Sequence, residues 1–294
     1  MSQTLSFDEF NKFYTPEIMF EVSYKRSPVL KQIDELFREL KNNIHDRSIH
    51  KQLEQRIQEF SKIKKIHFYI QKTEYNAFVY PVYKENLPEI FSEIEKVKSD
   101  TYAEETAKYI KRAYIVFGDG YVDEWSPRTL TAVLLHELGH LYQHTANYSF
   151  LIRRMSFIYS RKLFKGGGLA MGVATLFNPA FLPLLLASFA LSRTLTFNDH
   201  LAELDADSYA AKYGYAEELI RLHMSGIKWD NAVNKQKSWM SRMWDHLMSI
   251  ILPSTHPSDK DRVCNMIEKM KDEHKKMYPK MKKTFNIIYA DLKC

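Results

Sequence analysis

Apolar residues recur at helical spacing through much of the first sixty residues. A start signal at Ser27-Pro28 precedes an amphipathic segment that covers residues 29–43, and a second amphipathic segment covers residues 49–63. In both segments the apolar positions return every three or four residues, which is the period of one helix face. We therefore predict a helical N-terminal region, residues 1–62, that packs on a catalytic domain of residues 63–294.

Three short runs rich in aromatic and β-branched residues follow and predict strands. They are Ile66 to Ile70, Asn76 to Tyr83, and a run from Ala113 to a Gly-Asp-Gly turn at 118–120. Pro81 has no N–H group, which favours a sheet edge for the second run. A helix is predicted between the second and third runs, near residues 86–99. The pattern indicates an α+β, mostly helical fold with a small antiparallel sheet.

The next predicted helix has the clearest start in the chain. Ser126 is a good N-cap, Pro127 takes the first helical position, and the sequence TLTAVLLHELGHLYQH follows. The apolar residues around its few polar positions indicate a buried helix whose polar stripe faces a cleft. The pattern is helical again from Asp199 onward.

Residues 166–192 contain no charged side chain. About 20 apolar residues are enough to span a bilayer. However, three glycines open this stretch, and Asn178, Pro179 and Pro183 divide it into pieces that are too short to cross alone. A helical hairpin buried in the domain is the favoured interpretation, and contact with a membrane through 166–192 is the alternative.

Composition narrows the class of protein only slightly. The 294 residues are 45% hydrophobic and 27% charged, which is typical of a globular protein with a sizeable core. The net charge of +6 comes without a basic cluster with interleaved aromatics, so we expect no nucleic-acid partner. Two cysteines and the lack of a secretory signal favour a reducing, cytoplasmic location. The sequence carries no signal for an oligomeric state.

The segment from His136 to His140 reads HELGH and carries the candidate chemistry. On a helix, residues four apart share a face, so the imidazoles of His136 and His140 can reach one zinc ion. Glu137 lies next to them, where it can take a proton from a water molecule activated by the metal. We predict one zinc ion per chain.

A hydrolytic zinc site needs a third protein ligand. A histidine six residues beyond His140 would be one solution, but Ala146 occupies that position, and a straight helix would carry His144 too far along its axis. Glu203 on the later helix is the better candidate. Asp207, four residues on, shares its face and can orient a ligand histidine. Ala206, Ala210 and Ala211 would let this helix approach the first one closely.

These motifs resemble the gluzincin metallopeptidases of the CAAX prenyl protease, HtpX, Oma and BepA type. The resemblance covers roughly residues 64–270. It rests on HELGH, on the Glu-Leu-Asp-Ala-Asp run from Glu203, on Thr255-His256-Pro257 with Arg262 five residues after the proline, and on Asn76-Ala77-Phe78. Many members have an arginine three residues before the ligand glutamate, where this chain has His200.

The resemblance implies a zincin domain that hydrolyses peptide bonds. It implies that Glu203 is the third ligand, with Asp207 as its partner. It also implies that His256 lies beside the metal. There His256 would be either a fourth ligand that keeps the enzyme latent or a catalytic group that stabilises the oxyanion. Arg262 would pair with a carboxylate near the site. The strand at Asn76, Ala77 and Phe78 would line the cleft and pair with an extended protein or peptide substrate.

The sequence thus predicts a zinc metalloendopeptidase with Glu137 as general base. Two alternatives stay open. In one, the peptidase is latent and the protein acts mainly by binding proteins, as a chaperone-like factor. In the other, a membrane-associated protease acts through the hairpin at 166–192.

Overall fold

The computed structural model describes residues 27–72, 76–83, 107–142, 183, 199–243 and 256–273. In chain order the elements are α2 (Pro28–Asn42), α3 (Arg47–Ser61), β1 (Ile66–Gln71), β2 (Ala77–Tyr83), β3 (Ile110–Gly118), α6 (Asp119–Glu124), α7 (Pro127–Tyr142), α11 (Ala216–Gln236) and α13 (Asp259–Glu273). Residues 199–212 are also helical. This part of the chain is therefore mostly helical with one small sheet, as its sequence predicts.

Two of the sequence-based predictions concern residues outside these ranges. They are the helix near 86–99 and, apart from Pro183, the apolar hairpin at 166–192. His144 also lies outside them. No helix within the described ranges combines the length and the apolar character that crossing a membrane requires.

The three strands form one mixed sheet with the order β1-β3-β2. β2 pairs with β3 antiparallel, as expected, but β1 pairs with β3 parallel. The prediction of an antiparallel sheet was therefore wrong for one of the two pairings. β1 and β2 run in opposite directions, and because β3 lies between them, it has to run parallel to one and antiparallel to the other. β2 lies at an edge of this sheet, in agreement with the position of Pro81.

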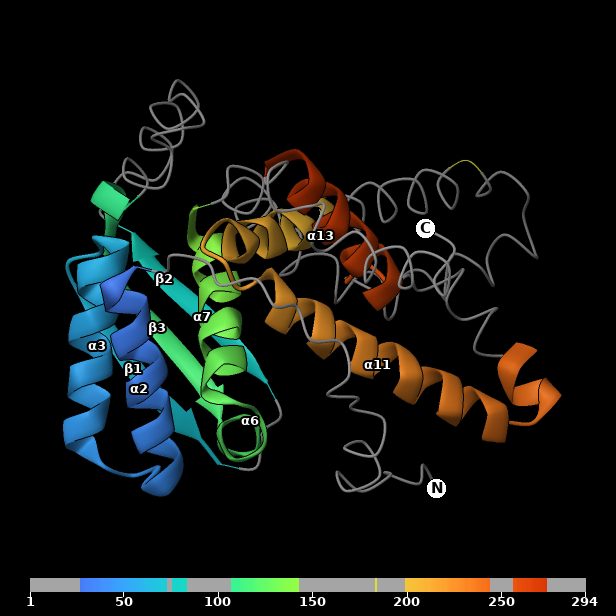
Figure 1. Cartoon of the computed structure of the whole chain (residues 1–294), viewed down its shortest axis with the longest axis horizontal. Coiled ribbons are helices and arrows are strands. Elements are labelled where there is room, and N and C mark those ends of the chain that lie inside the picture. Colours follow the sequence, from blue (N-terminus) through green and yellow to red (C-terminus); the bar gives the residue numbers. More distant parts are fainter. Residues whose placement is uncertain are drawn as a thin grey trace.

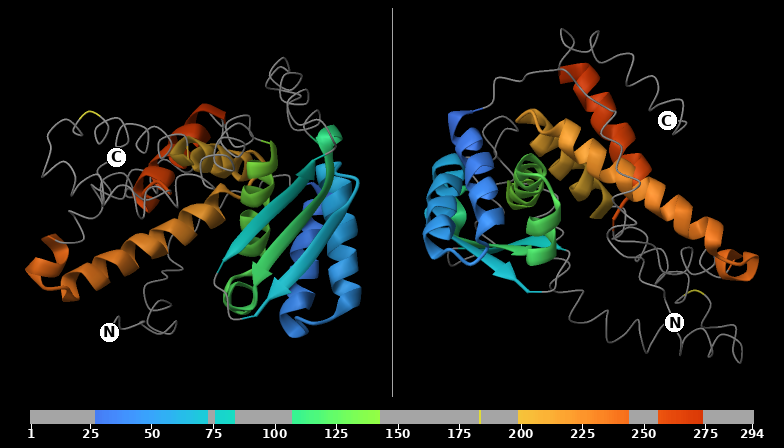
Figure 2. Two further views of the ribbon diagram at one scale, coloured as in Figure 1. Left: turned by 180° about the vertical axis from the view of Figure 1, so that it is seen from behind. Right: turned by 60° about the horizontal axis from the view of Figure 1, so that its bottom comes forward.

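The helices α2, α3 and α7 pack on the same face of the sheet (Figures 1 and 2). α3 contacts β1, α7 contacts β2, and α2 lies between α3 and α7. The rings of Phe37, Phe68 and Phe117 meet where α2 covers β1 and β3. Burial of such large apolar rings is the main driving force for this packing. One hydrophobic core therefore joins the first two helices to the sheet.

Polar contacts also connect α2 and α3 to later parts of the chain. The Tyr142 hydroxyl at the end of α7 donates to the Ser61 carbonyl at the end of α3, over 2.8 Å. The Tyr215 hydroxyl donates to Asp34 on α2 over 3.0 Å. The division into residues 1–62 and 63–294 remains a prediction, but α2 and α3 share contacts and core with the helix that carries HELGH.

Two local details differ from what the sequence suggests. The Gly-Asp-Gly segment is not a simple turn after β3, because Gly118 ends the strand and caps the short helix α6. Cys264 on α13 is disulfide-bonded, so the cysteine content by itself does not indicate a reducing compartment.

The start of α7 agrees with its prediction, since the Thr129 N–H donates to the Ser126 hydroxyl over 3.1 Å.

The main-chain N–H and C=O groups of successive β2 residues point alternately toward β3 and toward the open edge of the sheet. The Gly118 N–H donates to the Asn76 carbonyl over 2.8 Å. In an antiparallel pair every second residue bonds to the partner strand. The main-chain groups of Ala77, Val79 and Pro81 therefore face the open edge. The Ala77 N–H donates to the Asn76 side-chain oxygen, and Pro81 has no N–H to offer.

Candidate active site

The helix α7 places both histidines of HELGH on one side. The Nε2 atoms of His136 and His140 are 3.1 Å apart, and the two rings are nearly perpendicular. His136 is 7% exposed, and the apolar residues before it in α7 are buried. The prediction of a buried helix is therefore confirmed.

The helical residues 199–212 cross α7 at very close range. A Cβ atom built on Gly139 would lie 2.9 Å from the Cα of Ala206 and 3.1 Å from the Cβ of Tyr209. Only a glycine allows this separation, because the atoms it faces belong to the backbone and to a Cβ rather than to a flexible side-chain end. Ala206, one of the small residues predicted to let the two helices approach, is thus at the contact, and the contact brings Glu203 to the histidines.

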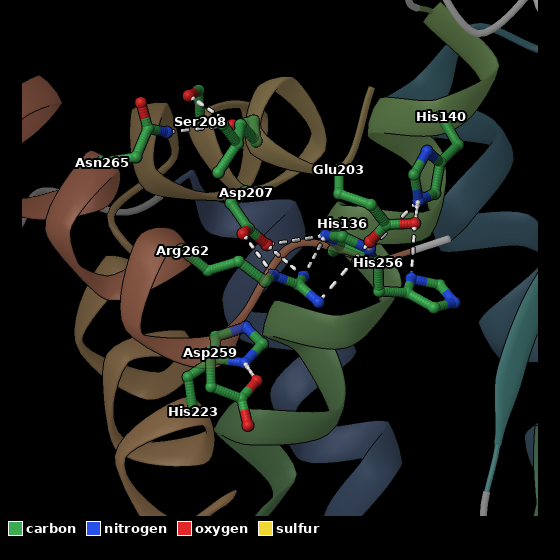
Figure 3. Close-up of polar contacts among 11 residues, drawn as sticks. His136, His140, Glu203, Asp207, Ser208, His223, His256, Asp259, Arg262 and Asn265 are labelled. Carbon is green, nitrogen blue, oxygen red and sulfur yellow. Dashed lines mark hydrogen bonds and ion pairs between the residues drawn. The ribbon is translucent and has the colours of Figure 1, made fainter. Parts of the chain in front are cut away.

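The Glu203 carboxylate contacts both imidazoles (Figure 3). Its Oε2 lies 3.4 Å from His136 Nε2, and its Oε1 lies 3.6 Å from His140 Nε2. Three ligand atoms held tetrahedrally about 2.1 Å from a zinc ion are about 3.4 Å apart. The His136–His140 separation is close to that value, and so are the two separations from Glu203, each of which is made by a different carboxylate oxygen. His136, His140 and Glu203 could therefore hold zinc.

Glu137 is a further candidate donor at this place. A carboxylate oxygen of Glu137 and nitrogens of His136 and His140 all lie within 4.8 Å of one another. Glu137 and Glu203 therefore both stand near the point that a metal would occupy. Glu203 is directed at both imidazoles, whereas the Glu137 carboxylate also accepts a hydrogen bond from the Val79 N–H at the open edge of β2.

Asp207 and Arg262 fix the orientation of the ligand side chains. His136 Nδ1 donates to Asp207 Oδ1 over 2.8 Å, which turns Nε2 toward His140 and Glu203. Arg262 donates to both carboxylate oxygens of Asp207, over 2.6 and 2.7 Å. Its Nη1 also lies 3.5 Å from Glu203 Oε2. A bidentate guanidinium–carboxylate pair gives a rigid geometry, and Asp207 is fully buried.

These contacts perturb the protonation of the whole cluster. Burial lowers the pKa of His136, but the hydrogen bonds to Asp207 and Glu203 outweigh it and raise the value to about 9. Burial, together with the charge of His136, lowers the pKa of His140 to about 3. Burial opposes ionisation of Glu203 and Asp207, yet their cationic partners hold both pKa values far below the ordinary range. Such strong shifts are typical of functional sites.

The environment of Glu137 favours a role in proton transfer. Burial is the main cause that raises its pKa to about 7, and the nearby Glu203 charge adds to this, against the effects of His136 and Arg262. A carboxyl group with a pKa near neutrality can both accept and donate a proton. Glu137 is therefore a candidate for proton transfer.

A cavity of about 380 Å³ opens over these residues. Asn76, Ala77 and Phe78 of the β2 region line it, together with the HELGH residues His136, Glu137 and His140. His256 also borders the cavity, with its Nδ1 3.0 Å from Glu203 Oε1. This hydrogen bond is the main cause that raises the pKa of His256.

The model of peptidase family M48 matches residues 43–270 of the chain. The chain belongs to peptidase family M48. No curated protein matches it. M48 peptidases depend on a metal, typically zinc, and membership therefore makes this chain a metallopeptidase. The match begins at residue 43, so it includes α3, which the motif resemblance had left outside.

The structure brings together the candidate site residues that the sequence singled out. His136, His140 and Glu203 converge, Asp207 and Arg262 adjoin them, and Glu137, His256 and the Asn76–Phe78 segment border the same cavity. Their individual roles in an M48 peptidase are taken up below as proposals.

Three residues at or next to the cavity had no sequence signal. Tyr121 on α6 and His223 on α11 line the cavity, and Asp259 on α13 hydrogen-bonds to His223. Burial, with the charges of Glu137 and Asp259, raises the pKa of the Tyr121 phenol, against a lowering effect of Arg262. Each of these residues stands alone in its segment, so no spacing could have identified it. Only Asp259, three residues before Arg262, adjoins a motif.

Replacing Gly139 by alanine tests the close helix contact. We expect the variant to lose about 1–3 kcal/mol of unfolding free energy, because the added methyl group meets backbone atoms. Zinc affinity should fall as well, since the contact sets the position of Glu203. Urea unfolding and competition with a chelator measure the two effects. Ser208→Ala, on the same helical stretch, is the matched control, and equal stability of G139A and wild type would contradict the argument.

Proposed function

We propose that this chain is a zinc-dependent endopeptidase of the gluzincin type. His136, His140 and Glu203 hold one zinc ion, and Asp207 and Arg262 hold these ligands in place. The observation that carries the proposal is the convergence of two imidazoles and one carboxylate. The Nε2 atoms of His136 and His140 are 3.1 Å apart, and the two oxygens of Glu203 lie 3.4 Å from His136 Nε2 and 3.6 Å from His140 Nε2, which is close to the spacing of ligands around one zinc ion. Two imidazoles and one carboxylate are a common ligand set of catalytic zinc in metallopeptidases.

When bound, zinc lowers the pKa of a water molecule and polarises the carbonyl group of the substrate. Glu137 accepts a proton from the attacking water and passes it to the leaving nitrogen of the cleaved peptide bond. Its pKa of about 7 suits both transfers. The Val79 N–H bond to Glu137 supports this role, because it fixes the carboxylate between the metal ligands and the edge strand.

Substrate lies extended along β2 in this proposal. The main-chain carbonyl groups of Ala77, Val79 and Pro81 face the open edge, where they can accept hydrogen bonds from the N–H groups of a polypeptide. Asn76, Ala77 and Phe78 line the cavity beside HELGH, so a strand bound there would pass over the metal ligands. Main-chain pairing of this kind selects little between side chains.

Metal analysis tests the ligand set. We expect about one zinc per chain in the wild type and, for Glu203→Ala, an affinity lower by more than about 100-fold, since even residues that only orient a ligand cost about 10- to 100-fold when removed. Elemental analysis and chelator competition measure both. Asp205→Ala changes an exposed carboxylate on the same helix and should keep the zinc. Zinc retained by Glu203→Ala, or absent from the wild type, would reject the proposal.

A latent peptidase is the second candidate, because His256 is bonded to the proposed ligand Glu203. If His256 stabilises the oxyanion of the reaction, His256→Ala should lower casein cleavage by about 10²–10³-fold. If His256 keeps the site latent, the same variant should raise cleavage. The rates of wild type and variant at equal zinc content decide between the two roles.

A further inference from the structure

His223 on α11 lines the cavity. Its ring is 6% exposed, and its Nδ1 donates to Asp259 Oδ1 over 2.7 Å (Figure 3). The other ring nitrogen, Nε2, is buried and has no hydrogen-bond partner among the residues that the structure describes. A buried polar atom without a partner costs free energy, so its retention in a cavity wall indicates that something else satisfies it.

The surroundings hold His223 in this orientation. Asp259 lies over Gly226, one turn beyond His223 on α11, and a Cβ atom at position 226 would stand 2.2 Å from Asp259 Oδ2. The absence of a side chain on Gly226 therefore makes room for the carboxylate. Asp259 in turn fixes the tautomer of His223, because a carboxylate can only accept the hydrogen bond from Nδ1–H. In the neutral ring Nε2 is then a hydrogen-bond acceptor.

Apolar side chains line the same cavity as His223. Val133 on α7 and Leu219 and Leu222 on α11 line it with His223. Val133 lies one helical turn before His136 and Glu137, so this part of the cavity adjoins the site of chemistry. Apolar side chains combined with a small number of placed polar groups are the usual lining of a binding pocket.

We infer that His223, positioned by Asp259, binds the polypeptide substrate by accepting a hydrogen bond at Nε2, and that it forms a substrate subsite with Val133, Leu219 and Leu222. This inference rests on the proposed peptidase function. The donor on the substrate is an N–H or O–H group, either from the main chain or from a side chain that enters the cavity. His223 is thus a substrate-binding residue, and Asp259 and Gly226 are positioning residues.

The test compares zinc-loaded full-length wild type with His223→Leu, His223→Gln and Gly226→Ala on a mixture of casein peptides, with cleavage sites read by mass spectrometry. We expect KM to rise about five- to tenfold in His223→Leu, with kcat changed less than about twofold. His223→Gln, which keeps an acceptor, should recover part of the loss. Gly226→Ala leaves His223 in place but displaces Asp259, so it should reproduce part of the loss even if His223→Leu folds poorly.

The pattern of the loss identifies the donor. A uniform rise in KM over all peptides would assign a main-chain N–H, whereas an altered preference at one position of the cleavage sites would assign a side chain. Asn234→Ala, exposed on the same helix, is the control and should behave as wild type. Unchanged KM and cleavage pattern in folded variants, or a loss confined to kcat or zinc content, would overturn the inference.

A binding measurement separates this inference from the peptidase proposal. Fluorescein-labelled casein is titrated with zinc-loaded Glu137→Gln, with and without His223→Leu, and anisotropy gives the dissociation constant. Weaker binding in the double variant supports the subsite even if the wild type cleaves nothing, in which case only the peptidase proposal fails. Equal binding in both proteins would reject the subsite.

Discussion

Glu137→Gln should abolish most casein cleavage while the protein keeps its zinc. The amide has nearly the shape of the carboxyl group but cannot carry the proton between the attacking water and the leaving nitrogen. General acid–base groups typically contribute about 10²–10⁴-fold, so we expect a rate loss in that range. The burial that raises the pKa of Glu137 also means that a neutral amide should be tolerated there.

The measurement is the cleavage rate of labelled casein with wild type and variant at equal, analysed zinc content. Asp205→Ala, on the exposed side of the ligand helix, controls for handling and folding. A Glu137→Gln protein that still cleaves within about tenfold of wild type would show that another group moves the proton. In that case Tyr121, whose phenol lies near Glu137, would be the next residue to change.

Arg262→Met should produce the largest loss of stability among the site variants. Asp207 is completely buried, and Arg262 satisfies both of its carboxylate oxygens while also facing Glu203. Removing one partner of a buried ion pair leaves an uncompensated charge, which typically costs about 3–5 kcal/mol. Zinc would offset some of the charge on Glu203, but Asp207 would keep its unpaired oxygen.

Urea unfolding in saturating zinc and in chelator measures this loss. Arg262→Lys keeps the charge but not the bidentate geometry, so it should fall between wild type and Arg262→Met. The double variant Asp207→Leu/Arg262→Met removes both charges and should lose less than the sum of the two single variants. Full additivity, or an Arg262→Met stability equal to that of wild type, would show that the pair does not stabilise the protein.

The parts of the site that follow local rules could be predicted from the sequence. Helical spacing placed His136 and His140 on one side of α7, and the same spacing paired Glu203 with Asp207. The alanines of the second helix indicated a close approach, and Gly139 supplies its other half. In each of these cases the prediction rests on the spacing of residues within one helix, or on small residues that allow two helices to approach closely.

The remaining features depend on contacts between distant segments. The parallel pairing of β1 arises because β3 inserts between two strands that precede it, and no periodicity within a strand encodes its neighbours. His223 and Asp259 are 36 positions apart and belong to different helices, so neither segment alone indicates their hydrogen bond. Such pairs become visible only when the helices are packed.

The open edge of β2 also bears on how the protein avoids pairing with a copy of itself. An exposed strand edge is a ready template for another β-strand, and repeated pairing of this kind leads to aggregation. Here Ala77 and Val79 have their outward N–H groups engaged by Asn76 and Glu137, and Pro81 has none. A second β2 strand would therefore find acceptors but few donors. An edge of this kind can receive a flexible polypeptide that brings its own N–H groups, while it resists the reciprocal pairing that would lock two copies together.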